Sequence, residues 1–255
     1  PGGFLKREGR PTENAVLTAR SIDRPIRPLF PSDLRNDVVV NNLILSVDHD
    51  YSPQVAALIG TSAAISISDI PWNGPVVGVQ VALIDDEVII NPTLEEFEAS
   101  DLDLFLAGTA TKINMIEAGA NEVSEKKMLE AIEKGHEVIR EMCLKIEDMR
   151  REIGKEKFSY KSTTPPAGLF AAVKGAYLDN MREAVLSADK SVRDKAVTEL
   201  SAKIKEFIEK NYPEEIEYTL GIIDDLEKYV VRDYLLNEKR RVDGRQLDEI
   251  RKLSA

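Results

Sequence analysis

Residues 77–90 read Val-Gly-Val-Gln-Val-Ala-Leu-Ile-Asp-Asp-Glu-Val-Ile-Ile, and this stretch decides the fold class of the first half of the chain. β-Branched and apolar residues fill two runs, 77–84 and 88–90, and the acidic residues between them are typical of a hairpin turn. A second pair of apolar runs, 102–106 and 113–116, is separated by Gly-Thr-Ala-Thr. The pattern therefore predicts two successive hairpins.

The segments around these hairpins alternate between strand and helix patterns. Residues 38–40 and 43–45 are apolar runs that predict a further strand, and residues 53–68, rich in Ala and other small residues, predict a helix packed closely on a sheet. Upstream, Thr12 can cap a short helix that extends to about Asp23. From Ser124 to Gly154, apolar residues recur at threes and fours, which predicts one long amphipathic helix. Together these patterns predict an α/β (α+β) layer for this part of the chain.

The last third of the chain is helical in pattern. After a break at Ser-Thr-Thr-Pro-Pro (162–166), three apolar stripes predict helices over 167–187, 191–210 and 214–236, which would form a small all-α bundle. A charged joint follows from residue 237. We expect an α/β core over 1–155, a helical domain over 160–236 and a joint over 237–255.

Charge is distributed unevenly. The 255 residues carry 34 basic and 45 acidic side chains, a net charge of −11, yet residues 1–35 hold seven basic and four acidic ones. A local anion site on an acidic protein is the physical expectation. No apolar run approaches the ~18 residues of a membrane-spanning helix, which predicts a cytoplasmic protein without a membrane partner. Because the chain starts at Pro1 and ends soon after a fresh motif at 241–245, we expect a piece of a longer protein.

The basic residues near the start are the strongest candidates for binding. Guanidinium groups match phosphate oxygens bidentately, and a neighbouring ring offers a base a stacking surface. The candidates are Phe4, Lys6, Arg7, Arg10, Arg20, Arg24 and Arg27. The alternative is that these arginines pair internally with Glu13, Asp23 and Asp33, while Phe4 is part of the core.

Other chemistry is weakly supported. Asp101 and Asp103 share one side of a strand, as metal carboxylates can, but a third ligand is missing. Cys143 falls on an apolar helical stripe and is expected to be a small buried hydrophobe. His49 and His136 are expected to be structural, Trp72 to pack in a turn, and Glu95-Glu96-Phe97-Glu98 to form a solvated helix face. Neither a zinc site, a nucleophile–base pair, a Walker loop nor a dinucleotide fingerprint is indicated.

Longer motifs add a family resemblance. Residues 2–11 read Gly-Gly-Phe-Leu-Lys-Arg-Glu-Gly-Arg-Pro, and residues 19–30 read Ala-Arg-Ser-Ile-Asp-Arg-Pro-Ile-Arg-Pro-Leu-Phe. With Leu-Asp-Leu at 102–104, Ala-Gly-Thr at 107–109 and Arg-Val-Asp-Gly-Arg at 241–245, the chain closely resembles bacterial polynucleotide phosphorylases over its whole length.

The resemblance implies an architecture and an activity. It implies a first RNase PH-like core that lacks its opening strands, a helical domain and the start of a second RNase PH-like core, with KH and OB-type modules beyond. Such proteins form ring-shaped homotrimers and degrade single-stranded RNA from its 3′ end with inorganic phosphate, and proteins of an RNA degradosome are candidate partners. The resemblance also implies Mg²⁺ or Mn²⁺, held by the absent second core.

The resemblance further implies that the chemistry lies outside this chain. The family's aspartate, aspartate and lysine on the catalytic strand of the second core correspond here to Phe97, Asp103 and Phe105. Its serine-rich phosphate loop corresponds to Tyr51-Ser52-Pro53-Gln54, in which Pro53 has no amide proton for an anion. A catalytically silent first core, with neither catalytic nor metal-binding residues, is the expectation.

RNA contact carries over better than catalysis. Phe4-Leu5-Lys6-Arg7 matches the family's basic-aromatic motif at the mouth of the central channel, with Leu5 and Lys6 departing from a second ring and an arginine. Arg10, Arg20, Arg24 and Arg27 match basic residues of the family. We therefore expect this part to supply RNA binding and a trimer scaffold. The alternatives are a purely structural scaffold and a retained phosphorolytic site at Asp101 and Asp103.

Overall fold

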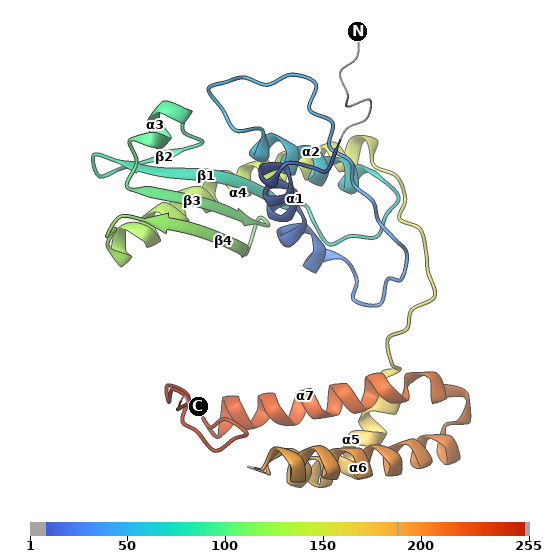
Figure 1. Ribbon diagram of the computed structural model, residues 1–255. Helices are drawn as coiled ribbons and strands as arrows, with labels where there is room; N and C mark the ends of the chain where they lie inside the picture. Colours follow the sequence, from blue (N-terminus) through green and yellow to red (C-terminus); the bar gives the residue numbers. More distant parts are fainter. Residues whose placement is uncertain (1–8, 188, 253–255) are drawn as a thin grey trace. The chain divides into compact units, whose positions relative to one another are not determined.

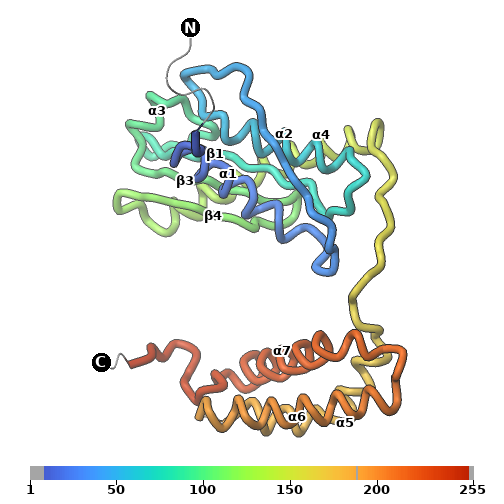
Figure 2. Tube along the Cα trace, turned by 45° about the vertical axis from the view of Figure 1, so that its right-hand side comes forward, coloured from blue at the N-terminus to red at the C-terminus, as the bar shows by residue number. Residues whose placement is uncertain are grey.

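The computed structural model describes residues 9–187 and 189–252, which belong to two compact units, Pro1–Lys161 and Ser162–Ala255. Figures 1 and 2 show an α/β arrangement in the first unit and helices alone in the second. The predicted fold class, an α/β core followed by an all-helical domain, is confirmed.

The sheet of the first unit has four strands in the order β2-β1-β3-β4, and each neighbouring pair is antiparallel. The strands are β1 (Val77–Ile84), β2 (Glu87–Ile90), β3 (Leu102–Gly108) and β4 (Ile113–Ala120). Asp85 and Asp86 have φ of 48° and 67°, the left-handed conformations that a two-residue hairpin turn requires. Both predicted hairpins are confirmed.

Helices cover both faces of this sheet. The helices are α1 (Glu13–Ile26), continued by a short 3₁₀ helix η1 (Arg27–Leu29), then α2 (Pro53–Ile67), α3 (Leu94–Glu98) and α4 (Glu125–Ile153). On one face, Val79 and Leu104 pack against the Ile139 side of α4. On the other face, Phe105 packs with Ile22 of α1 and with α2 residues. Because side chains alternate along a strand, β3 supplies both cores.

Capping residues set the helix ends that the sequence indicated. The Thr12 hydroxyl accepts a hydrogen bond from the Ala15 amide at 3.2 Å, and the Ser124 hydroxyl accepts one from the Lys127 amide at 3.3 Å. Gly154 follows the last residue of α4. These side chains satisfy helix amides that have no partner within the helix.

The strand predicted over 38–45 is wrong. Residues 36–48 have no regular secondary structure, and the side chains of Leu43 and Leu45 are 84% and 93% exposed. The Asn42 side chain accepts a hydrogen bond from the Thr61 hydroxyl at 3.1 Å, which ties the segment to α2. An apolar run becomes a strand only beside a partner strand, and within the described part of the chain this segment has none.

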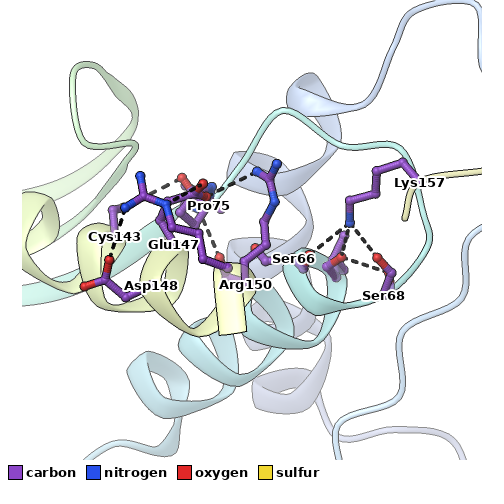
Figure 3. A network of polar contacts seen from close by, with 12 residues as sticks. Ser66, Ser68, Pro75, Cys143, Glu147, Asp148, Arg150 and Lys157 are labelled. Carbon is purple, nitrogen blue, oxygen red and sulfur yellow. Dashed lines mark hydrogen bonds and ion pairs between the residues drawn. The ribbon is translucent and has the colours of Figure 1, made fainter. Parts of the chain in front are cut away.

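Lys157 holds the segment that follows α4 against the end of α2. Lys157 Nζ donates to the carbonyls of Ile65, Ser66 and Ser68 at 3.2, 2.9 and 2.6 Å, at the end of α2 (Figure 3). The Phe158 amide also donates to the Asp69 carbonyl at 2.8 Å. Burial and the positive charge of Arg150 lower the pKa of Lys157. The ammonium group thus satisfies helix-terminal carbonyls that lack partners within α2.

The second unit is built from helices around its own core. Its elements are α5 (Ala167–Val185), α6 (Lys190–Asn211), the 3₁₀ helix η2 (Pro213–Tyr218) and α7 (Thr219–Asn237). Val173, Ile204 and Leu226, one from each long helix, are fully buried in a common cluster. The three predicted helices are confirmed, except that the third opens with the 3₁₀ turn at Pro213. Over the residues described, no helix is both long and apolar enough to cross a membrane.

Candidate functional site

A cleft of about 500 Å³ lies between α1 and the sheet of the first unit. Figures 1 and 2 show this helix and the sheet side by side. Its lining is mostly polar and mixes both charges with carboxamides. The lining residues are Asn14, Leu17, Thr18, Arg20, Ser21, Arg24, Gln54, Gln80, Asp103, Phe105, Glu117, Ala118 and Gly119.

Helix α1 directs two arginines toward this cleft. Arg20 and Arg24 are four residues apart, so they lie on one helix face, while Ile22 and Ile26 are buried against the core. The Asn114 side chain of β4 donates to the Pro25 carbonyl at 2.8 Å and fixes the end of α1 over the sheet. The cleft therefore gathers two of the predicted arginines.

Arg20 and Arg24 differ in their pairing. Arg24 Nη1 lies 3.5 Å from Glu117 Oε2, and both side chains are more than half exposed. The Arg20 side chain makes no ion pair or hydrogen bond with any described residue. An exposed ion pair is worth only ~0.2–1 kcal/mol, so an incoming anion competes with Glu117 for Arg24 at small cost.

Arg27 lies outside the cleft. Its guanidinium donates from both Nε and Nη2 to the Asp23 carboxylate, with a shortest distance of 2.6 Å, and this hydrogen bonding raises the pKa of Arg27. The internal pairing expected under the structural alternative thus holds at this position. Arg10 is exposed and makes no contact of this kind with the residues described, whereas Phe4, Lys6 and Arg7 lie outside them.

Two carboxylates from neighbouring strands form part of the cleft floor. In the β3–β4 register Phe105 is opposite Glu117, and Asp103 lies two residues away on the same face. Partial burial raises the pKa of Asp103, and the negative charge of Glu117 raises it further. Of the two aspartates considered as metal ligands, only Asp103 lines the cleft, and among the described residues no group of three or more His, Cys, Asp or Glu is placed so that it could hold a metal ion.

Phe97, Phe105 and Gln54, which the resemblance matches to catalytic and phosphate-loop positions of the family, take part in other contacts. Phe97 lies on α3 rather than on β3, and Phe105 is 5% exposed and packs in the core. At the start of α2 the Ser52 hydroxyl accepts a hydrogen bond from the Gln54 amide, and the Gln54 side chain donates to the Ser21 hydroxyl at 2.7 Å. The first turn of α2 is therefore hydrogen-bonded to α1 through the Gln54 side chain.

Gln80 and Glu117 line the cleft but were not predicted from the sequence. Gln80 interrupts the apolar run of β1, and this break was a usable signal for a polar site. Glu117 could be placed beside Arg24 only through the strand register, which sequence periodicity does not reveal.

Three residues that were predicted to be structural, Cys143, Trp72 and His136, are confirmed in that role. Cys143 is buried, 3.7 Å from the carbonyls of Pro75 and Gly108, and burial raises the pKa of its thiol to about 11 (Figure 3). Trp72 is buried and donates from Nε1 to the Ile26 carbonyl at 3.2 Å. His136 Nε2 lies 3.0 Å from the Thr109 carbonyl. These contacts tie helices to the sheet and to loops.

Comparisons with known proteins cover both units. Residues 2–71 and 74–138 match the models of domains 1 and 2 of the 3′ exoribonuclease family, and residues 168–246 match the model "Polyribonucleotide nucleotidyltransferase, RNA binding domain". The polyribonucleotide nucleotidyltransferase of Ruminiclostridium cellulolyticum is 53% identical over 255 residues, and that of Lachnoclostridium phytofermentans is 46% identical over 256. These alignments cover 100% of this chain and 36% and 37% of the relatives, so the chain spans about a third of their length.

A solved structure titled as an Archaeoglobus fulgidus exosome with RNA bound to the active site is also similar. The sequence identity is 19%, the TM-score is 0.41, and the match covers 56% of this chain and 66% of the other.

Proposed function

Because this chain belongs to the polyribonucleotide nucleotidyltransferase family, we propose that it is the RNA-binding, non-catalytic part of a phosphorolytic 3′-to-5′ exoribonuclease. In this proposal residues 1–155 are the first RNase PH-like core, 160–236 the helical domain, and 237–255 the start of a second core. The chemistry belongs to that second core.

The composition of the cleft between α1 and the sheet carries the proposal. It has arginines suited to phosphate but only Asp103 at the positions where two carboxylates and a lysine would be needed. Phosphoryl transfer with a metal requires carboxylates to hold the ion and a cation to neutralise the developing charge. Phe105 supplies neither group, because its side chain is packed in the core.

The cleft's own side chains can hold and orient RNA. Arg20 can meet a phosphate directly, and Arg24 can exchange its single contact with Glu117 for a phosphate that the guanidinium group binds bidentately. Arg10, Lys6 and Arg7 extend this basic stretch toward the start of the chain, with Phe4 as a stacking ring. Arg27 has a secondary role, because it is already paired with Asp23.

The remaining features of the proposal come from the family. They are a homotrimer, a second RNase PH-like core with KH and OB-type modules in the same polypeptide, partner proteins of an RNA degradosome, and a cytoplasmic location. Inorganic phosphate is the co-substrate. In this proposal Mg²⁺ or Mn²⁺ is held by the second core, as the family resemblance implies.

The first test is release of ADP from poly(A) by the 255-residue chain with Mg²⁺ and inorganic phosphate, and the full-length protein is the positive control. We expect no release from the chain. Phosphate-dependent release would mean that this half has a catalytic site of its own, and the silent assignment of Phe97, Phe105 and Pro53 would be wrong.

The second test is binding of a labelled oligoadenylate at several salt concentrations. Arg20→Ala with Arg24→Ala should weaken binding and its salt dependence, because fewer counterions are released when fewer phosphates are contacted. The matched control is Arg140→Ala with Arg151→Ala, two exposed arginines of α4 on the other face of the sheet. Equal binding by both double variants would contradict the cleft as the RNA contact.

A second candidate, a purely structural scaffold, is favoured by the pairs Arg24–Glu117 and Arg27–Asp23. It predicts that neither an oligonucleotide nor tungstate raises the melting temperature, whereas a ligand that binds only the folded chain must raise it. A rise that disappears in the Arg20→Ala, Arg24→Ala variant favours the RNA-binding function.

A further inference from the structure

The second unit separates its charges by helix. Helix α6 carries six basic and four acidic side chains, whereas residues 213–237, which form η2 and α7, carry two basic and seven acidic ones. An anionic partner is therefore attracted to the α6 side of this unit and repelled from the α7 side.

A groove of about 320 Å³ lies between α5 and α6 on that basic side. It is lined by Tyr177 of α5 and by Lys203, Glu206, Phe207, Lys210 and Asn211 of α6. The rings of Tyr177 and Phe207 meet edge to face, with centroids 5.5 Å apart at 81°. The Tyr177 hydroxyl donates to the Lys203 carbonyl at 3.4 Å. The rings are thus held in place before any ligand arrives.

The two groove lysines are available for an external anion. Lys195 and Lys205, also on α6, lie 4.0 and 3.8 Å from the glutamates four residues later. Lys203 and Lys210, in contrast, make no ion pair with a described residue. They are seven residues apart, so they share one helix face and are separated by ~10.5 Å along the axis.

A competing groove on α7 is less suited to an anion. Its lining includes the cations Lys228 and Arg232, but Asp225 and Asp233 lie in the same groove, and Lys228 Nζ is 3.7 Å from Asp225 Oδ1. The Tyr229 ring is already occupied by Lys174 Nζ, 3.6 Å from the ring centroid. The α5–α6 groove, in contrast, combines aromatic side chains with two lysines that make no ion pair with a described residue.

We propose that the α5–α6 groove is a second binding site for single-stranded polynucleotide, separate from the cleft of the first unit. Lys203 and Lys210 contact phosphates, and the rings of Tyr177 and Phe207 contact bases, a combination that binds single strands without sequence preference. Glu206 opposes the phosphates and limits the affinity. The inference rests on the proposed function only in taking RNA as the polynucleotide. The matching family model is named an RNA-binding domain, but that name does not say which surface binds RNA.

The test is fluorescence anisotropy of labelled oligoadenylate with the 255-residue chain. Lys203→Gln with Lys210→Gln should weaken binding about tenfold at low salt and should reduce the slope of log K against log salt by ~1.4, since each single-strand phosphate contact contributes ~0.7. Lys195→Gln with Lys205→Gln, the same charge change on the same helix, should alter binding less than about twofold. Glu206→Gln should tighten it.

The proposal would be overturned by equal weakening by both lysine pairs, by an unchanged salt slope in the groove variant, or by no effect of Glu206→Gln. Circular dichroism and the melting temperature identify any variant that fails to fold, and Tyr177→Leu then tests the stacking surface without changing charge. Loss of binding in the Arg20→Ala, Arg24→Ala variant with normal binding in the groove variant would reject this site alone. Loss in the groove variant alone would reject the first-unit cleft instead.

Discussion

The ionised carboxylate of Asp103 lowers the stability of the folded protein, and the size of this effect depends on pH. Its folded pKa is raised by partial burial and by Glu117, so the folded state binds more protons than the unfolded state between the two pKa values. Stability therefore falls as the pH rises from the unfolded value of ~3.9 through the folded value, and the full penalty is present at neutral pH.

Asp103→Asn should raise the melting temperature at pH 7, and the gain should disappear near pH 3, where the wild-type carboxyl is already protonated. We expect less than about 1 kcal/mol, the usual size of exposed electrostatic effects. Thermal melts from pH 3 to 8 check this, with Asp101→Asn, which does not line the cleft, as the control. An Asp103→Asn curve parallel to the wild-type curve would show that Asp103 does not titrate differently on folding.

Cys143 should be chemically silent in the folded protein. With a thiol pKa of about 11, the thiolate is on the order of 0.1% of the population at pH 8, against roughly a quarter for a free cysteine. Because this is the only cysteine, thiol titration with a disulfide reagent reports on it directly. We expect labelling at least ~100-fold slower in buffer than in denaturant, and comparable rates would mean that the α4–sheet interface opens readily.

At the scale of elements, close approach of α4 to the sheet depends on Gly135. A Cβ at this position would lie 2.9 Å from Leu106 Cδ2 and 3.2 Å from Val81 Cγ2. Gly135→Val adds a branched side chain there and should cost roughly 2–3 kcal/mol through overpacking. Gly60→Val, also within a helix but with no atom within 4 Å of the added Cβ, should leave the stability nearly unchanged. Urea denaturation of both variants checks the contrast, and similar midpoints would contradict it.

Elements with local signals could be predicted from the sequence, and those that depend on distant partners could not. The 77–90 hairpin carries its own turn, and α4 carries its cap at Ser124, so both were predicted correctly. Residues 38–45 have the same apolar composition as β1, yet they form no strand because pairing, rather than propensity, decides.

The candidate site divides in the same way. Arg20 and Arg24 could be placed on one helix face from their spacing of four residues. The partner Glu117 and the carboxamide of Gln54 reach the cleft only through tertiary packing, and Arg27 looked equivalent to Arg24 in sequence until its bond to Asp23 was seen.

At the scale of the whole molecule, the two units have separate hydrophobic cores. Leu104 belongs to a cluster built from the sheet and α4, whereas Ile204 belongs to one built from α5, α6 and α7, and both side chains are fully buried. Cooperative unfolding follows shared cores, so the chain should unfold in two calorimetric transitions. Each transition can then be assigned by a single substitution.

Ile204→Ala should lower the melting temperature of one transition and Leu104→Ala that of the other, each by an amount that corresponds to ~2–5 kcal/mol for a buried large-to-alanine change. Differential scanning calorimetry of the two variants and the wild-type chain is the measurement. Ile153→Ala, at an exposed α4 position with 62% exposure, is the control and should shift neither transition by more than the effect of an ordinary surface change. A single transition that moves with both core variants would show that the units unfold together, and RNA binding at one unit would then stabilise the other.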